Sequence, residues 1–334
     1  MAVVDERSRP LRDLRISITD RCNFRCTYCM PREHFGADHE FLQREALLTY
    51  EEIVKVVSAL LPAGLEKVRI TGGEPLLRRD LTTLVQMLRR EGPALDLALT
   101  TNGVLLNNHA EALREAGLDR VTVSLDAIDT EVFRAMADTD RFASNNVLEG
   151  IDAARKAGLG VKVNTVVRKN VNENQILKLA EACMSRQVPL RFIEFMDVGN
   201  TNAWNMEAVV TGNEVRRRIE KHVGKLSPVE GRKSEVARNW VTSSGYIFGF
   251  INSVSEPFCG GCTRARLSAN GSLYTCLFAS NGHDLRALLR MGATEDEMLA
   301  AIRSIWTARR DQYSVERTAN EQPRAKVEMS FIGG

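Results

Sequence analysis

The sequence lacks the long apolar runs that would place it in a membrane. No stretch approaches the roughly 18 consecutive apolar residues of a spanning helix, and residues 1–14 contain no apolar core of signal-peptide length. We therefore expect a cytoplasmic protein with no membrane contact. The sequence also lacks an excess of either charge, since 45 Lys and Arg against 43 Asp and Glu give a net charge of +2. This balance argues against a nucleic-acid binder, although a local basic pocket is compatible with it.

Low-complexity linkers, repeats and a G-x-G-x-x-G motif after the first expected strand are also missing. The last absence weakens a dinucleotide-binding interpretation. With 334 residues, 44% of them hydrophobic, the chain can bury the core of one large domain or of a domain with an appendage. Seven cysteines are an odd number for a disulfide framework, and six fall into two groups of three. Two metal sites in a reducing compartment fit this distribution better.

Alternating strand and helix patterns indicate an α/β fold over the first two hundred residues. Apolar alternation predicts strands at 14–18, 67–71, 96–101, 120–126, 160–167 and 190–196. Helical patterns lie between them at 49–61, 80–90, 108–116, a stretch ending near 156, and 173–184. Strands separated by helices imply parallel pairing with right-handed crossovers. A partial (β/α)6 TIM-type barrel is preferred to an open sheet, with functional residues at the carboxyl ends of the strands.

The pattern changes after about residue 200. A helix is expected at 209–224, strands or a ribbon within 236–253, a turn at Asn270-Gly271, and two amphipathic helices at about 285–291 and 294–309. We therefore divide the chain into a barrel of residues 1–200 and a C-terminal extension of residues 201–334. The arginines at 216–218 and at 309–310 are expected to lie on solvated helix faces.

Cys22, Cys26 and Cys29 form a C-x3-C-x2-C motif just past the first expected strand. Three thiolates supply one ligand fewer than a structural zinc site or a simple electron-transfer 4Fe-4S cluster usually takes. One position of such a metal centre is therefore free to bind a small molecule. A zinc loop and three unrelated buried thiols are the alternatives.

This loop resembles the signature of the radical S-adenosylmethionine enzymes. The resemblance implies that the three cysteines hold a 4Fe-4S cluster, whose open iron is chelated by the amino and carboxylate groups of S-adenosylmethionine. It also implies contacts to that cosubstrate from Tyr28, Gly73, Ser124 and Met196, with Tyr28 against the adenine. Without the resemblance, Ser124 would be an ordinary strand-end hydroxyl and Met196 a core residue.

Cys259, Cys262 and Cys276 form a second three-ligand set, spaced C-x2-C-x13-C. A C-x2-C pair alone suggests zinc about as often as iron, but the second missing fourth ligand favours another open cluster. His283 is near enough in the sequence to be a fourth ligand, although a solvated loop histidine is the simpler interpretation. Cys183 lies on an apolar helix face and is expected to be a core thiol.

The two cysteine sets together resemble the GTP 3′,8-cyclases, the radical S-adenosylmethionine enzymes that begin molybdenum cofactor biosynthesis. The matching segments are RISITDRCNFRCTYCMP, KVRITGGEPLLRRD, TTNG, VSLDA, VKVNTV, RFIEFM, FCGGCTRARLS, CLF and the final GG. The resemblance implies a lyase with two 4Fe-4S clusters that converts GTP to (8S)-3′,8-cyclo-7,8-dihydroguanosine 5′-triphosphate. The open iron of the second cluster would bind the guanine base.

The same resemblance assigns GTP binding to residues around the barrel mouth, namely Arg15, Arg69, Thr100, Lys162, Arg264, Ala265 and Arg266. A triphosphate with a charge of about −4 needs several converging cations, preferably arginines. Thr101 fits the motif as well as Thr100 does. Gly333 and Gly334 would normally be a frayed end, but the resemblance implies that they reach into the active site and take part in catalysis.

The family also implies an electron donor such as flavodoxin or ferredoxin, a downstream cyclic pyranopterin monophosphate synthase that receives the product, and a homodimer. Two other functions stay open. One is a radical S-adenosylmethionine enzyme with an auxiliary cluster that modifies a peptide, although such proteins usually carry more C-terminal cysteines than the three present here. The other is a non-catalytic scaffold stabilised by zinc.

Overall fold

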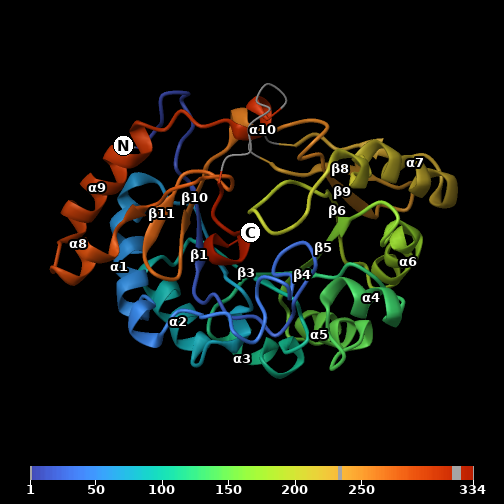
Figure 1. Ribbon diagram of the computed structural model, residues 1–334, viewed down its shortest axis with the longest axis horizontal. Helices are drawn as coiled ribbons and strands as arrows, with labels where there is room; N and C mark the ends of the chain where they lie inside the picture. Colours follow the sequence, from blue (N-terminus) through green and yellow to red (C-terminus); the bar gives the residue numbers. More distant parts are fainter. Residues whose placement is uncertain (1, 232–234, 318–324, 334) are drawn as a thin grey trace.

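The structure, a computed structural model, describes residues 2–231, 235–317 and 325–333. Its inner layer consists of parallel strands that lie side by side in chain order. They are β1 (Asp13–Ser17), β2 (Lys67–Thr71), β3 (Asp96–Thr101), β4 (Arg120–Ser124), β5 (Gly160–Val167) and β6 (Leu190–Glu194). Figure 1 shows these strands as a curved wall with helices around its outside. The predicted partial (β/α)6 barrel is confirmed.

Helices follow the strands and cover their outer face. They are α1 (Tyr50–Leu60), α2 (Leu81–Glu91), α3 (Ala110–Glu115), α4 (Thr130–Ala137), α5 (Ser144–Lys156) and α6 (Ile176–Ser185). Thr49 caps α1 as expected, since its hydroxyl accepts from Glu52 N while the Glu52 carboxylate accepts from Thr49 N. The predicted helical stretch before residue 156 is two helices, because Asp138 takes a left-handed φ of 45° and ends α4.

The C-terminal extension adds strands to both edges of the same sheet. β10 (Arg264–Leu267) pairs in parallel with β1, and β9 (Ile247–Ile251) pairs in parallel with β6. Further out lie β11 (Ser272–Tyr274) and β12 (His283–Asp284) on one side, and β8 (Arg238–Val241) and β7 (Ser227–Pro228) on the other. The remaining helices are α7 (Gly212–Val223), α8 (Arg286–Arg290), α9 (Glu295–Thr307), α10 (Tyr313–Glu316) and α11 (Met329–Ile332).

The hydrophobic core lies between the outer face of the sheet and the helices. Leu14 and Ile16 of β1 are fully buried in this core, so Arg15 between them points to the concave face. Cys183 on α6 is also buried in the core, as predicted. The concave face is therefore the one that carries the charged side chains of the strands.

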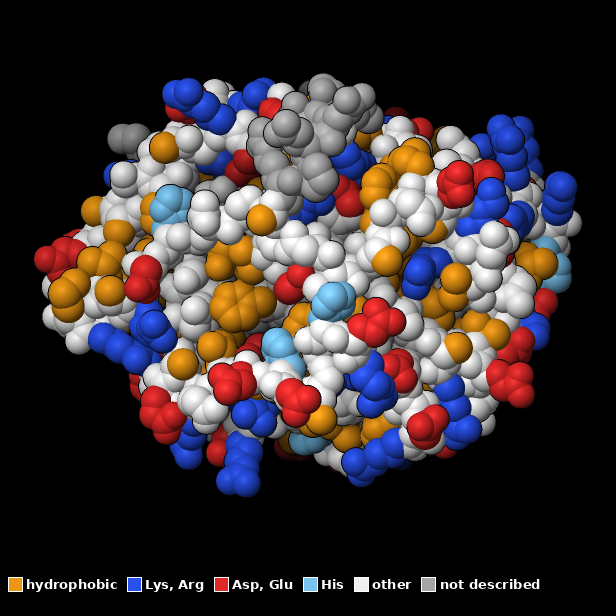
Figure 2. All heavy atoms as spheres, viewed as in Figure 1, with side chains coloured by type: hydrophobic (Ala, Val, Ile, Leu, Met, Phe, Trp, Pro, Cys, Tyr) orange, Lys and Arg blue, Asp and Glu red, His pale blue; other side chains and the backbone are white. Residues whose placement is uncertain are grey.

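The C-terminal segment returns to the barrel. α11 contacts β1, and Ile332 and Gly333 are buried. In Figure 1 the red end of the ribbon runs into the centre of the ring of strands. Seen from the same side, charged side chains lie mainly around the rim, while the centre shows mostly uncharged atoms (Figure 2). Among the described residues, no helix has the length and apolar character needed to cross a membrane.

Trp306 ties α9 to the start of the chain and offers a test of this architecture. Its indole is fully buried, and its Nε1 donates to Arg9 O at 3.0 Å. We expect Trp306→Ala to lower the free energy of unfolding by about 3–5 kcal/mol, because a large cavity replaces the ring. Trp306→Phe keeps most of the volume and should cost much less. Urea unfolding followed by circular dichroism measures both, and an unchanged midpoint in the alanine variant would contradict this packing.

Candidate functional site

The loop after β1 brings Cys22, Cys26 and Cys29 together. The amides of Cys29 and Met30 both donate to Cys26 O at 2.9 Å, and Phe24 N donates to Cys22 Sγ at 3.4 Å. None of these cysteines forms a disulfide. Burial raises the pKa of Cys22 to about 12, and burial followed by the neighbouring thiols raises the pKa values of Cys26 and Cys29. Thiolates in this position need a cation beside them, which a metal cluster would supply.

The glycine-rich loop after β2 packs directly against this cysteine loop. Gly73 N donates to Thr19 O and Glu74 N donates to Arg21 O, both at 2.8 Å. A Cβ on Gly73 would overlap the backbone of Arg21. Gly73 thus lies beside the first cysteine set, but the close approach that requires glycine is to protein backbone. Glu74 is buried and accepts from Thr101 Oγ1 at 2.8 Å, and burial raises its pKa to about 7.

Tyr28 and Ser124 line one small cavity next to the first cysteine set. The Tyr28 hydroxyl donates to Asp126 Oδ2 at 2.7 Å, and burial raises the pKa of Asp126 to about 6. Ser124 is paired in register with Asn164 of β5, whose Oδ1 is buried with no partner among the described residues. Met196 lies two residues beyond β6. Sequence analysis missed Asn164, although a polar residue on the concave side of an alternating strand was a usable signal.

The second cysteine set lies at the opposite end of the strands. Because β10 runs parallel to β1 and starts at Arg264, Cys259 and Cys262 come just before its first residue, level with the start of β1. Cys276 follows β11, which runs back antiparallel to β10. Burial alone would raise the pKa of Cys262, but Arg264 and Arg309 lower it to about 6. Burial raises the pKa of Cys276 to about 12.

Arg9 and Arg309 brace the backbone of this second set. Arg9 Nη1 donates to Cys259 O at 3.0 Å, and Arg309 Nη1 donates to Cys262 O at 2.8 Å. Both guanidinium groups also contact the buried Asp5 carboxylate, at 2.6 and 3.5 Å. The expected solvated position of Arg309 is wrong: the residue is only 4% exposed. Its partner Asp5 lies 304 positions earlier, so no local pattern could show the pair.

Between the two cysteine sets, the concave face carries a row of cations, of which Arg266 is buried and Arg15 and Arg69 are partly buried. The register places Arg266, Arg15 and Arg69 side by side on β10, β1 and β2. Arg15 Nε is buried and has no partner among the described residues. Arg69 Nη1 donates to the hydroxyls of Thr100 and Thr122, both at 3.0 Å. Burial, followed by the charge of Arg15, lowers the pKa of Arg69 to about 9. A bound anion would relieve this mutual repulsion.

Lys162 continues this cationic face on β5. Burial, followed by the charges of Arg191 and Arg120, lowers the pKa of Lys162 to about 8. Arg191 on β6 is a further cation that sequence analysis missed, and burial lowers its pKa as well. The sequence could have indicated Arg191, because this residue interrupts an apolar strand just as Arg15 does.

The structure separates Thr100 from Thr101 and places some other predicted residues differently from what the sequence suggested. Thr100, the predicted GTP contact, faces the concave side, whereas the Thr101 hydroxyl donates to the buried Glu74. The Ala265 side chain belongs to the hydrophobic core, so only its backbone is available to the barrel interior. The cations lie along the strands, rather than around the mouth formed by the carboxyl ends. His283 is exposed on β12.

Gly333 lies beneath Arg266 inside the barrel. Arg266 Nη1 donates to Gly333 O at 2.8 Å, and both residues are buried. Gly333 has a φ of +72°, and a Cβ there would overlap Thr71 Cγ2. A residue with a side chain therefore requires the Thr71 side chain to move and is strained by the positive φ. Gly334 lies outside the described residues, so its predicted position stays a prediction.

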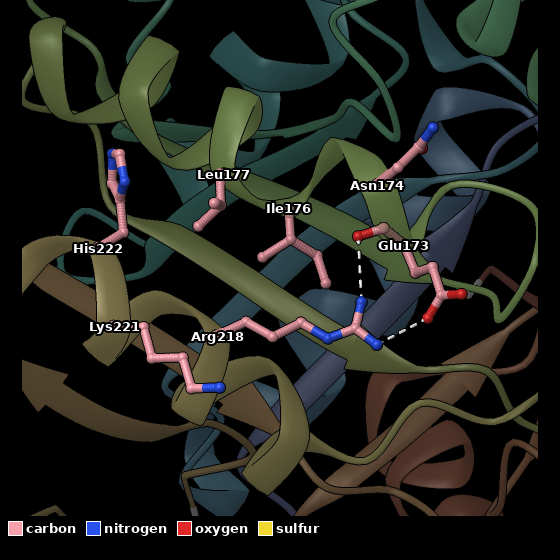
Figure 3. A pocket seen from close by; sticks show the side chains of 7 residues that line it. All are labelled: Glu173, Asn174, Ile176, Leu177, Arg218, Lys221 and His222. Atoms are coloured by element: carbon pink, nitrogen blue, oxygen red, sulfur yellow. Dashed lines mark hydrogen bonds and ion pairs between the residues drawn. The ribbon is translucent and has the colours of Figure 1, made fainter.

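A hollow of about 380 Å³ between α6 and α7 contains none of the predicted residues. Figure 3 shows that its Arg218 already pairs with Glu173, at 2.8 Å. Among the described residues, no group of three or more His, Cys, Asp or Glu is compact enough to hold one metal ion. A four-iron cluster asks for a different arrangement, because each cysteine binds a separate iron. Two sets of disulfide-free cysteines fit that requirement.

Known proteins with similar sequences and folds identify the family of this chain. A family model described as the radical SAM superfamily matches residues 16–183, and one described as Molybdenum Cofactor Synthesis C matches residues 188–315. The crystal structure of SuiB from Streptococcus suis bound to S-adenosylmethionine shares the fold, with a TM-score of 0.63 and 14% identity over 94% of this chain and 69% of that chain. The fold and the superfamily match define a radical SAM protein.

Relatives that match over their full length identify one family within the radical SAM proteins. Proteins named GTP 3′,8-cyclase from Staphylococcus epidermidis and Staphylococcus aureus are 48% and 45% identical to this chain, each over 99% of both sequences. The chain belongs to the GTP 3′,8-cyclase family.

Arg15 allows a test of the cation row. We expect Arg15→Met to raise the thermal midpoint of the ligand-free protein, because it removes a partly buried charge that loses hydration and repels Arg264. The same change should remove the stabilisation produced by tripolyphosphate, an anion that fits the row. Arg12→Met is the control, since Arg12 is half exposed in a surface pair with Glu66 and should change stability by about 0.5 kcal/mol or less. A lower midpoint for Arg15→Met would contradict this account.

Proposed function

We propose that this protein is a radical S-adenosylmethionine lyase that converts GTP to (8S)-3′,8-cyclo-7,8-dihydroguanosine 5′-triphosphate, the first step of molybdenum cofactor biosynthesis. The observation that carries the proposal is that two cysteine trios lie at opposite ends of the same strands, with buried and partly buried cations on the concave face between them. The identity to full-length GTP 3′,8-cyclases supports it.

In this proposal the first trio holds a 4Fe-4S cluster and S-adenosylmethionine, while the second trio holds a second 4Fe-4S cluster. β1 covers about 13 Å at about 3.3 Å per residue, so the two centres leave room between them for a cosubstrate and a nucleotide. S-adenosylmethionine bound at the reduced first cluster supplies a 5′-deoxyadenosyl radical. Tyr28, Gly73, Ser124 and Met196 are assigned to orient that cosubstrate, and the unpartnered Asn164 amide oxygen adds an acceptor beside Ser124.

The GTP triphosphate is assigned to the cation row. Arg15, Arg69, Arg264, Arg266 and Lys162 would hold it. Arginine supplies a planar fork of donors that matches phosphate oxygens. The Thr100 hydroxyl accepts from Arg69 and so fixes the direction in which its other donors point. Such a lining suits a polyanion better than an uncharged peptide.

Other features are proposed on family grounds. They are a cytoplasmic location, a flavodoxin-like or ferredoxin-like electron donor, transfer of the product to cyclic pyranopterin monophosphate synthase, and a homodimer. We retain the division into a barrel of residues 1–200 and an extension of residues 201–334. The extension is not a separate layer, because its strands β9 and β10 continue the barrel sheet.

Cysteine variants test the proposed division of labour. Reconstituted wild-type protein should contain about eight irons per chain and form 5′-deoxyadenosine and a cyclised nucleotide from S-adenosylmethionine and GTP under anaerobic, reducing conditions. Cys22→Ala should abolish both products. Cys276→Ala should lose about half the iron and mainly the cyclised nucleotide. The matched control is the core thiol variant Cys183→Ala, which should retain both activities. Wild-type turnover in Cys22→Ala or Cys276→Ala would defeat the proposal.

The lowered pKa of Lys162 predicts how GTP affinity depends on pH. In the ligand-free protein Lys162 carries its proton below about pH 8 and loses it above. Attraction for the triphosphate is therefore strongest at low pH, and GTP affinity should fall as the pH rises from 7 to 8.5. Lys162→Arg keeps its charge over this range and should flatten the fall. Titration calorimetry measures both, and an equal slope in the two proteins would exclude this role for Lys162.

A further inference from the structure

The loop after β6 is joined to the C-terminal tail by a dense set of polar contacts. We define the β6 loop as residues 197–201 and the tail as residues 325–333. The tail ends at Gly333 beneath Arg266, and the β6 loop directly follows Met196. Contacts between these two segments therefore connect a proposed S-adenosylmethionine contact with the buried Gly333.

Asp197 is the centre of these contacts. Its carboxylate accepts from the Tyr313 hydroxyl at 2.6 Å, Arg317 Nη1 at 2.6 Å and Lys326 Nζ at 2.7 Å. Lys326 Nζ also donates to the Asp197 backbone carbonyl at 2.6 Å. Burial alone would raise the pKa of Asp197, but hydrogen bonds from Lys326, Tyr313 and Arg317 lower it below its ordinary value. A mostly buried carboxylate with two cationic partners is costly to leave unpaired.

A second carboxylate, that of Glu328 in the tail, adds further hydrogen bonds between the tail and the β6 loop. Glu328 Oε1 accepts from Asn200 N at 2.9 Å, and Glu328 Oε2 accepts from Thr201 Oγ1 at 3.1 Å. Asn200 and Lys326 are linked in both directions, because Lys326 N donates to Asn200 Oδ1 and Asn200 Nδ2 donates to Lys326 O. The β6 loop therefore fixes both the side chain and the backbone of the tail.

The segment after Cys276 also contacts the tail and Tyr313. The Phe278 and Tyr313 rings stack at 4.4 Å, and Lys326 Nζ lies 4.8 Å from the Tyr313 ring centre. Val327 N donates to Ala279 O at 3.0 Å. The tail thus rests between the loop that follows β6 and the loop that follows the second cysteine set.

We propose that Asp197 is a positioning residue that holds the tail in the barrel and so places Gly333 beneath Arg266. From Glu328 the chain needs only the single turn of α11 to reach Gly333, so an anchor at Lys326 and Glu328 sets the depth of insertion. The burial of Ile332 and the contact of α11 with β1 also hold this end of the tail, so the anchor acts together with them to keep the Gly333 carbonyl against the buried guanidinium group. The proposal rests on the proposed function for its catalytic consequence, but not for its structural one.

Trypsin cleavage after Lys326 tests the structural consequence independently of activity. Asp197→Asn keeps the size of the side chain but removes its charge, so Lys326 should become accessible. Release of the peptide VEMSFIGG, followed by mass spectrometry, should be faster by about tenfold or more. Asp152→Asn is the matched control, because Asp152 pairs with Arg186 on the outer helices, away from the tail. Equal cleavage rates in wild type and Asp197→Asn would overturn the proposal, whatever the enzyme does.

The catalytic consequence needs a second measurement on the reconstituted enzyme. Asp197→Asn should keep its iron and its formation of 5′-deoxyadenosine, while cyclised nucleotide per 5′-deoxyadenosine falls by about tenfold. Asp197→Glu, which restores the charge, should recover part of that ratio, a rescue that a general loss of stability would not give. An unchanged ratio with faster cleavage would overturn the link to catalysis. If Asp197→Asn loses its iron, Glu328→Gln replaces it. This variant weakens the anchor from the tail side, and the same trypsin cleavage and product ratio are measured on it. A wild type that makes no cyclised nucleotide defeats the proposed function alone.

Discussion

The parallel pairing of β10 with β1 is the constraint on which the site depends. β1 leads into the first cysteine loop at its carboxyl end, while the second cysteine set precedes the amino end of β10. One register, in which Asp13 lies opposite Arg264 and Arg15 opposite Arg266, therefore fixes both the separation of the two sets and the cations between them. Without the extension, β1 would be an exposed edge strand with unpaired backbone groups.

The cations of the concave face oppose folding and favour the binding of an anion through the same physical effect. Arg15, Arg69 and Arg266 lie in neighbouring positions on adjacent strands, and burial followed by mutual repulsion lowers the pKa values of Arg69 and Arg266. Structural needs alone would put uncharged residues there, because buried ion groups rarely add stability. Their presence is understandable if an anion completes the site. The hydrophobic side chains buried on the outer face of the same strands stabilise the fold and offset the unfavourable free energy of the clustered cations.

The features that could be predicted from the sequence are those set by local patterns of residues. The bounds of β2, β3 and β5 agree with the predicted strands, because their alternation is regular and turn residues or caps follow. The cysteine spacing likewise predicts two metal-binding loops, and the six cysteines of the two sets form no disulfides. The pairing of β9 and β10 with the edges of the barrel was not predicted, since four- and five-residue strands carry no signal for distant partners. The contacts of Asp197 and Arg309 were missed for the same reason: each depends on residues more than a hundred positions away.

Arg266 connects the tail with the proposed nucleotide site. A guanidinium group has five N–H donors in a fixed plane, and among the described residues one of them, on Nη1, donates to the carbonyl of Gly333. That bond orients the group, and donors that remain free would be available to the proposed phosphate oxygens. Glycine is required at the contact because its φ is +72° and Thr71 leaves no space for a Cβ. In the proposed site, a tail that leaves the barrel would therefore leave the arginine itself in place, but it would free its side chain to rotate away from the row.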